Sequence, residues 1–250
     1  MNNLHCGTIQ TPMTKAEFQN LGNKSNLGIG IFKIFIPDYV HSITSLIENL
    51  DKEERLRARR YHFDADRNRF IISRSFLKIL LAEKIGIKAN EVQIEKDSFD
   101  KPYLPSYPNL YFNLSHSGDY ILIIIGDKKV GIDIEKINYT QNFSDILPTI
   151  FSKYEIDELL ISSNKTLTFY KFWTRKEAIL KAIGKGMNED LKSITVTDGE
   201  HSVPTDILSL NSQFVILSFE VDGNHVGAIA FEGLYENSVE QMYFSQLPRL

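Results

Sequence analysis

The order of strand-like and helical segments repeats once along the chain, and this repeat limits the fold more than any other feature. From residue 28, a β-branched and aromatic segment is followed by two segments with apolar residues at helical spacing and then by three short strand-like segments. The same order starts again near Lys128. The sequence therefore predicts an α+β fold of two similar β-α-α-β-β-β halves, with a ligand bound in the groove between them.

Residue ranges define the two halves and their elements. The N-terminal half, residues 28–127, is predicted to contain strands at 28–36, 92–96, 110–114 and 120–125 and helices at 42–61 and 66–85. The C-terminal half, residues 128–250, is predicted to contain strands at 130–137, 193–197, 214–221 and 226–231 and helices at 145–160 and 167–183. We expect the polar residues 1–27 to form a disordered leader.

The cysteine content and the first residues indicate where the protein works. Cys6 is the single cysteine of the 250 residues, which excludes an intrachain disulfide and a four-thiolate metal site. The N-terminal residues lack the apolar core of a signal peptide. The longest apolar run, Tyr120 to Ile125, is far too short to cross a membrane. These observations predict a cytoplasmic protein.

Positive charge is concentrated in one part of an acidic chain. The net charge is −4, but residues 51–78 contain nine Lys and Arg against five Asp and Glu. A cluster from Arg55 to Arg74 within an acidic protein indicates a localised anion, such as a nucleotide or phosphate group, more than a long polyanion. A solvated helix face rich in arginine would give the same composition.

Two carboxylates alternate along the predicted strand at residues 130–136. Because successive side chains of a strand point to opposite faces, Gly131, Asp133 and Glu135 share one face. Carboxylates this close disfavour joint ionisation unless a cation lies between them, and oxygen ligands suit magnesium. The alternative is an edge strand with solvated acids, paired with Lys128 or Lys136.

The predicted helix at 167–183 places charged side chains in and beside an apolar stripe. The stripe consists of Phe169, Phe172, Trp173, Leu180 and Ile183. Lys176 falls inside this stripe, and Glu177 and Lys181 lie on its flank. Buried charges are costly without partners, which favours a charged site. Glu177 and Lys181 also have the spacing of an ordinary ion pair on an exposed helix, so that alternative stays open.

Polar side chains crowd the end of the predicted strand at 110–114. Ser115, His116 and Ser117 precede Gly118, where hydroxyls, a ring nitrogen and backbone N–H groups can converge on a phosphate oxygen. A serine hydrolase is excluded, because neighbouring strand residues point to opposite faces and no Gly-x-Ser-x-Gly segment occurs. For each of these residues taken singly, an ordinary strand-end turn is the alternative.

In this order and at these separations, the motifs resemble those of the 4'-phosphopantetheinyl transferases, in particular the long Sfp-type members. The matching residues are Lys101-Pro102, residues 112–118, Gly131 to Glu135, Trp173 with Lys176 to Ala178, and Lys181 to Gly186. The resemblance implies a pseudo-twofold α+β protein that binds coenzyme A between its halves. A groove between two halves of one chain needs no second subunit, so we expect a monomer.

The resemblance also implies a reaction and a metal. The 4'-phosphopantetheine arm of coenzyme A would move to a serine hydroxyl of an apo acyl or peptidyl carrier protein, releasing adenosine 3',5'-bisphosphate. Asp133, Glu135 and Glu177 would hold Mg²⁺ against the pyrophosphate. Either Glu177 or a water held by Glu135 would accept the serine proton, and Lys181 would neutralise charge on the pyrophosphate.

The same resemblance implies the residues that bind coenzyme A. Ser115 and His116 would grip the 3'-phosphate or nearby groups, and Arg57 and Lys101, the latter beside Pro102, would bind the nucleotide phosphates. Departures from the family occur at Asp100, where glycine is usual, and at Phe70, where some relatives have a small hydroxyl residue. Residues 1–27 match nothing in the family.

Two other functions use the same residues. A non-catalytic nucleotide-binding or nucleic-acid-binding module would use the Arg55 to Arg74 cluster, with Tyr61, His62 and Phe63 interleaved, and would need no metal. Another magnesium-dependent phosphohydrolase would use the three carboxylates without a protein acceptor. The acidic total counts against a nucleic-acid partner, and we expect neither a nucleic acid nor a membrane as partner.

Overall fold

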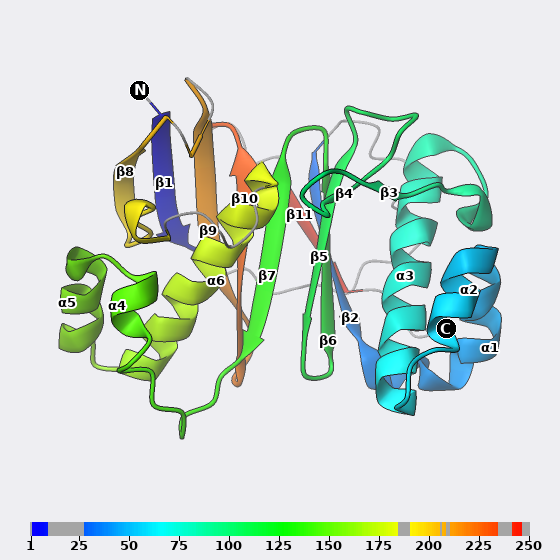
Figure 1. The fold of residues 1–250 in the computed structure, drawn as a ribbon, viewed down its shortest axis with the longest axis horizontal. Coiled ribbons are helices and arrows are strands. Elements are labelled where there is room, and N and C mark those ends of the chain that lie inside the picture. The colour runs from blue at the N-terminus through cyan, green and yellow to red at the C-terminus, as the bar shows by residue number, and fades with distance from the viewer. Residues whose placement is uncertain are drawn as a thin grey trace.

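The protein is a mixed α+β molecule in which two sheets stand next to each other and helices cover their outer faces (Figure 1). The computed structural model describes residues 2–9, 28–184, 191–205, 207–208, 211–234 and 242–246. Within these residues, no helix combines the length and the apolar character needed to cross a membrane.

The first sheet has the strand order β11-β2-β6-β5. Its strands are β2 (Ile29–Phe35), β5 (Tyr111–Ser117), β6 (Tyr120–Gly126) and β11 (Met242–Gln246). β6 pairs antiparallel with both β2 and β5, whereas β11 pairs parallel with β2. The structure thus contains the strands predicted at 28–36, 110–114 and 120–125.

Helices and short turns connect β2 to β5. They are η2 (Ile36–Ser42), α1 (Ile43–Leu46), η3 (Ile47–Asn49), α2 (Lys52–Ala58), α3 (Asp64–Ile85) and η4 (Ala89–Glu91). The helical segment predicted at 42–61 is broken at Asp51, because this residue caps α2 with its side chain. A small hairpin of β3 (Glu95–Lys96) and β4 (Pro102–Tyr103) leads into β5. The strand predicted at 92–96 is therefore only two residues long.

The second sheet has the strand order β7-β10-β9-β1-β8. Its strands are β1 (Asn2–Thr8), β7 (Val130–Lys136), β8 (Gly199–Val203), β9 (Gln213–Asp222) and β10 (His225–Glu232). The intervening helices are α4 (Leu147–Ile150), α5 (Lys153–Ile161), α6 (Lys165–Ile183) and η5 (Leu191–Ser193). α6 crosses the face of this sheet diagonally (Figure 1).

Two expectations about the second sheet are wrong. Residues 2–8, placed in a disordered leader, form β1, which pairs parallel with β9 and antiparallel with β8; residues 10–27 of that segment lie outside the described residues. The segment predicted as a strand at 193–197 forms no strand, although Ile194 and Val196 are fully buried. Their carbonyls bind side chains of α6 in place of a neighbouring strand.

Apolar side chains fill three layers. One cluster lies between α6 and the second sheet, and another between α3 and the first sheet. The third contains residues of β2 and β6 together with residues of β7, β9 and β10, so the two sheets pack against each other through their inner faces. This packing brings β5 of one sheet next to β7 of the other, and the charged motifs lie along that line.

Candidate active site

Side chains of β5 accept hydrogen bonds from the backbone of β7, where a neighbouring strand of a sheet would use its backbone carbonyls. Asn113 accepts a hydrogen bond from the backbone N–H of Ile132 at 3.0 Å, and the Ser117 hydroxyl accepts one from the N–H of Lys136 at 2.9 Å. β5 and β7 belong to different sheets, so these N–H groups would otherwise lack a strand partner. We call this line of contacts the β5–β7 seam.

The two carboxylates of β7 point into the seam. Ser115 donates to Asp133 Oδ1 at 2.8 Å, and Ser117 donates to Glu135 Oε2 at 3.2 Å. The Trp173 indole on α6 also donates a hydrogen bond to Glu135. Asp133 is 4% exposed, so its charge needs partners inside the protein.

Gly131 allows α6 to approach β7 closely. A Cβ atom at this position would lie 2.1 Å from the Ala178 carbonyl oxygen and 2.5 Å from the Ala182 nitrogen, and both are backbone atoms that cannot turn aside. The glycine beside the two carboxylates therefore has a packing role. It brings Glu177 and Lys181 of α6 to the side of Asp133.

Lys181 forms the centre of the cluster. Its ammonium group donates to Asp133 Oδ1 at 2.6 Å, to the Ser115 hydroxyl at 3.2 Å and to the Ile132 carbonyl at 3.3 Å. One cation thus contacts one carboxylate directly, while Glu135 and Glu177 stand nearby. Three acidic groups around a single lysine leave negative charge in excess.

The excess charge appears in the pKa values and in unpaired oxygens. Burial, reinforced by the negative charge of Asp133, raises the pKa of both Glu177 and Glu135. Among the described residues, Asp133 Oδ2 and Glu177 Oε1 are buried and find no hydrogen-bond donor. A divalent cation would satisfy both oxygens and relieve the repulsion, so the donor set suits Mg²⁺. The described side chains are not arranged as a ready set of three or more metal ligands.

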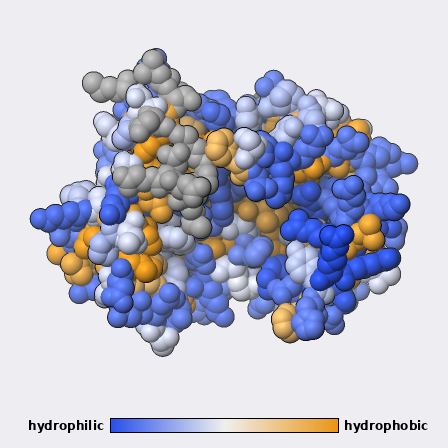
Figure 2. All heavy atoms as spheres, in the orientation of Figure 1, coloured by the Kyte–Doolittle hydropathy of each residue, from blue (hydrophilic) through white to orange (hydrophobic). Residues whose placement is uncertain are grey.

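A basic pocket opens on the other face of β5. A cavity of about 330 Å³ is lined by Arg57, Tyr61, Asp66, Arg69, Phe70, Ser73, Arg74, Leu77, Pro102, Phe112, Asn113, Leu114 and His116. An adjacent hollow shares Arg57, Phe70, Arg74 and Pro102. In Figure 2, strongly hydrophilic side chains gather over α2 and α3, beside this pocket. Arg69 pairs with Asp66 at 3.1 Å and Arg74 pairs with Glu54. The lining nevertheless contains three guanidinium groups and a single carboxylate, that of Asp66, so the cavity suits an anion.

The pocket contains three of the predicted coenzyme A ligands. Arg57 lies over the Phe70 ring, with 4.9 Å from its guanidinium carbon to the ring centroid, so the residue that departs from the family supports an arginine here. His116 is accessible at the pocket wall, yet desolvation and the positive charge of Arg69 lower its pKa. Pro102 completes the wall between the pocket and the β3–β4 hairpin.

The structure places Ser115 and Lys101 elsewhere. Ser115 lies with the carboxylates, whereas its neighbour His116 faces the pocket, as the alternation of a strand requires. Lys101 donates to the Ala182 carbonyl at 2.7 Å, at the end of α6. Burial, together with the charge of Lys129, lowers the pKa of Lys101 to about 8.

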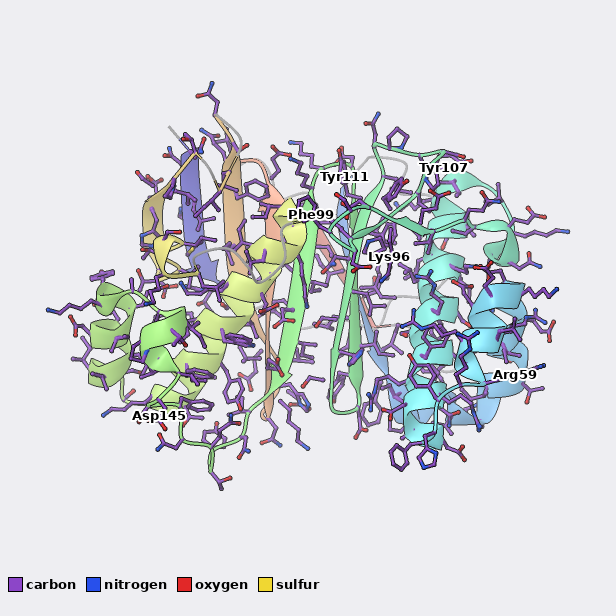
Figure 3. The ribbon with its side chains drawn as sticks, viewed as in Figure 1. Arg59, Lys96, Phe99, Tyr107, Tyr111 and Asp145 are labelled. Carbon is purple, nitrogen blue, oxygen red and sulfur yellow. The ribbon has the colours of Figure 1, made fainter. Side chains whose placement is uncertain are left out.

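The backbone at Asp100 explains why glycine is usual at this position. Asp100 has a φ of 63°, in the left-handed region that favours glycine, and its carboxylate accepts a hydrogen bond from Lys96 at 2.9 Å. The turn therefore keeps the required geometry. Figure 3 shows Phe99 at the tip of this hairpin, close to the end of α6.

Lys176 is not part of the site. Its ammonium group is fully buried and contacts Glu155 at 2.9 Å, and it also donates to the carbonyls of Leu191 and Ile194. The charged-site interpretation of this lysine is therefore wrong, because the charge belongs to a structural ion pair under α5. Glu177 and Lys181 lie beside the carboxylates of β7, whereas Lys185 and Gly186 lie outside the described residues.

Sequence reasoning assigned no individual role to four residues that shape the site, although each lay within a motif or cluster singled out from the sequence. Asn113 and Ser117 hold β7, and Arg69 and Arg74 line the basic pocket. A signal for the first pair was present, because Asn113, Ser115 and Ser117 alternate along one face of a strand. The two arginines could be recognised only as members of a cluster, since α3 presents arginines both to the pocket and to solvent.

Comparison with known proteins gives one consistent family. Residues 129–230 match a family model described as the 4'-phosphopantetheinyl transferase superfamily, and residues 38–127 match a model described as 4'-phosphopantetheinyl transferase, N-terminal. A 4'-phosphopantetheinyl transferase of Bacillus subtilis is 32% identical over 156 residues, which are 60% of this chain and 69% of the relative.

Two further relatives share similar levels of identity. The 4'-phosphopantetheinyl transferase Sfp of Bacillus subtilis strain 168 is 28% identical over 186 residues, covering 72% of this chain and 81% of the relative. The L-aminoadipate-semialdehyde dehydrogenase-phosphopantetheinyl transferase of Mus musculus is 28% identical over 213 residues, covering 79% of this chain and 66% of the relative. The two matched regions together contain the basic pocket and the carboxylate cluster.

Proposed function

The chain belongs to the 4'-phosphopantetheinyl transferase superfamily, and we propose that the β5–β7 seam is its catalytic centre and the basic pocket its coenzyme A site. The protein is a transferase that moves phosphopantetheine to carrier proteins. The observation that carries the assignment of residues is the convergence of Lys181, Asp133 and Glu177 at the seam, next to the pocket that contains Arg57 and His116.

The reaction requires little covalent chemistry from the protein. A serine hydroxyl of the carrier forms a bond to the phosphorus that bears the pantetheine arm, and the bond from this phosphorus to the bridging oxygen of the pyrophosphate breaks. The arm remains on the serine as a phosphodiester, and adenosine 3',5'-bisphosphate leaves with the electron pair. Positioning and charge neutralisation dominate the catalysis of such transfers.

The side chains of the seam are suited to these tasks. Glu177 has a raised pKa and a free buried oxygen, so it can accept the serine proton; a water held by Glu135 is the alternative base. Lys181 neutralises charge on the pyrophosphate. Asp133, Glu135 and Glu177 would hold Mg²⁺, which supplies charge neutralisation to the phosphate oxygens when bound.

The basic pocket is suited to the nucleotide part of coenzyme A. Arg57 and His116 bind its phosphates, with Pro102 in the wall, and the 3'-phosphate lies against His116. We assign Ser115 to the catalytic cluster more than to this phosphate, because its hydroxyl is held by Asp133 and Lys181. Lys101 binds a phosphate near the end of α6, where its ammonium group donates to the Ala182 carbonyl.

We propose that the halves 28–127 and 128–250 are related by a pseudo-twofold and that the protein acts as a cytoplasmic monomer. Parallel features of α3 and α6 support this relation: each helix ends at a left-handed glycine, Gly86 or Gly184. Each also contains a fully buried lysine, Lys78 or Lys176, paired with a glutamate of the preceding helix. The β5–β7 seam lies between the halves and needs no second chain.

A mass-shift assay tests the proposal. Purified protein, coenzyme A and Mg²⁺ should add about 340 Da, the mass of the arm, to the serine of an apo carrier protein. Removal of the metal with EDTA should abolish the shift, and added Mg²⁺ should restore it. If coenzyme A is hydrolysed at the same rate without a carrier, the protein is a phosphohydrolase. If it binds coenzyme A but modifies none of a panel of apo acyl and peptidyl carriers, it is a binding module.

A further inference from the structure

Arg175 is a fully buried arginine whose side chain binds three separate segments of the chain. Its Nε donates to the Ser218 hydroxyl at 2.7 Å, and its Nη1 donates to the Val196 carbonyl at 2.6 Å. Nη2 donates to the Gly7 carbonyl and to Asp198 Oδ1, both at 2.6 Å. Such a planar group with several fixed donors holds its partners in one relative geometry.

These contacts attach α6 to the N-terminal strand. Arg175 lies on α6, Ser218 on β9, and Gly7 at the end of β1; Thr8 adds a hydroxyl to Nη2 at 3.3 Å. β1 lies outside both regions that match the family models, which are residues 38–127 and 129–230. An element beyond the matched regions therefore binds the helix that presents the catalytic groups.

The position of Arg175 on α6 relates it to the site. At about 100° per residue, Arg175, Ala178 and Ala182 share one face of the helix. This face contacts the sheet, because Ala178 and Ala182 pack on Gly131. Glu177 and Lys181 lie on the neighbouring face, beside Asp133. A rotation or slide of α6 on the sheet would move both of them away from β7.

We propose that Arg175 is a positioning residue that couples β1 to the catalytic cluster: with β1 in place, it holds α6 at the rotation that sets Glu177 and Lys181 against Asp133. The inference rests on the proposed function, in which Glu177 and Lys181 act on the substrates. It predicts that removing the hydrogen bonds of the Arg175 side chain slows the chemical step. The basic pocket between α2, α3 and β5 should stay unchanged.

Kinetics of full-length variants test the coupling. Arg175→Met should lower kcat by about tenfold to 100-fold at a temperature where it is fully folded, because small misplacements of reacting groups have effects of this size. KM for coenzyme A should rise by a smaller factor than kcat falls, since the basic pocket is untouched and only Lys101 and Lys181 are attached to α6. Arg175→Lys should recover part of kcat, because an ammonium group can reach some of the same acceptors.

Lys171 provides the matched control. It lies one turn earlier on α6 and donates to Asp198 at 3.0 Å, with 22% of its side chain exposed. Lys171→Met removes a charge from the same helix and from the same carboxylate, but leaves the contact of Arg175 with β1. Its kcat should remain within about twofold of the wild-type value.

Hydrogen exchange separates the possible outcomes. In Arg175→Met, amides of α6 around Glu177 and Lys181 should exchange faster than in Lys171→Met. A folded Arg175→Met with wild-type kcat and wild-type protection would overturn the inference. If Arg175→Met does not fold, kcat and hydrogen exchange of α6 are measured in Asp198→Asn and Thr8→Val, and these variants then test the coupling. If the wild type transfers no arm to any carrier, the proposed function fails, and the exchange data alone decide whether β1 controls α6.

Discussion

The helices α3 and α6 are built on the same frame but carry different charges. Each ends at a glycine with positive φ, 73° at Gly86 and 76° at Gly184. Each has a fully buried lysine eight residues before this glycine: Lys78 before Gly86 in α3, and Lys176 before Gly184 in α6. Lys78 contacts Glu54 at 2.6 Å and Lys176 contacts Glu155 at 2.9 Å, and both glutamates belong to the capping box of the preceding helix.

The difference between the helices appears in the next turn. One residue after its buried lysine, α3 has Ile79 where α6 has Glu177, and four residues later α3 has Glu83 where α6 has Lys181. The buried lysines that the two helices share are structural, whereas Glu177 and Lys181, which α3 lacks, lie at the site. This comparison also explains why Lys176, although it lies beside Glu177, has no place among the catalytic residues.

The largest expected effect is on kcat, and it should distinguish a substitution at Glu177 of α6 from one in the equivalent turn of α3. Glu177→Gln should lower kcat by about 10² to 10⁴, the usual contribution of a general base, with little change in the circular dichroism spectrum. Glu83→Gln, on α3, should leave kcat unchanged. The carrier mass-shift assay measures both rates. Wild-type turnover in Glu177→Gln would mean that the serine proton goes to another group.

The shared lysines should affect stability and not catalysis. Lys176→Met leaves the buried Glu155 without its cation and should lower the free energy of unfolding by about 3–5 kcal/mol. Lys78→Met should cost less, because Glu54 keeps its ion pair with Arg74. Urea titration measures this change. Adding Glu155→Gln to Lys176→Met should restore most of the stability, because the unpaired charge is removed. A Lys176 variant that keeps its stability and loses its activity would place this lysine back in the site.

Substitutions of the glycines that end α3 and α6 should have smaller effects, and they should differ in KM for coenzyme A. Gly86→Ala and Gly184→Ala each put a side chain at positive φ, which costs about 1–2 kcal/mol of stability. A Cβ at Gly86 meets no atom within 4 Å, whereas one at Gly184 would lie 2.9 Å from the Lys101 side chain. Only Gly184→Ala should therefore raise KM for coenzyme A. Equal KM values in the two variants would show that Lys101 does not contact the nucleotide.

The smallest effect concerns the pH dependence of stability. Because the pKa of Glu177 is raised in the folded protein, the folded state binds this proton more tightly than the unfolded state does. Glu177→Gln should thus be more stable than the wild type at neutral pH. The advantage should shrink as the pH falls through the raised pKa towards the ordinary value of 4.5. Urea titrations from pH 8 to pH 4 measure it, and a variant less stable at all pH values would contradict the raised pKa.

Local pattern was sufficient to predict the long elements and the main charged residues. The periodicity of α3 and α6 and the β-branched runs of β2, β6, β7, β9 and β10 are properties of adjacent residues, so the sequence displays them directly. The alternation of Gly131, Asp133 and Glu135 likewise predicts which side chains share a face. The close contact of α6 with Gly131 follows from the same pattern only when the partner of the strand is known.

Contacts between distant residues account for what was missed. β1 is partly polar, and it becomes a strand because β8 and β9 flank it. The sequence around Ile194 and Val196 resembles a buried strand, but their carbonyls accept hydrogen bonds from the side chains of Lys176 and Arg175. In each case the partner lies far along the chain, where periodicity gives no information.

The pairing of β1 and β11 with strands far away in the sequence has a consequence for synthesis of the chain. β1 is synthesised before its partners β8 and β9, at residues 199–222, and β2 is synthesised before its partner β11, at residues 242–246. Both sheets therefore depend on pairings that span almost the whole sequence, which folding reaches late. A chain interrupted before residue 199 would carry β1 without either partner, and such unpaired edges promote aggregation.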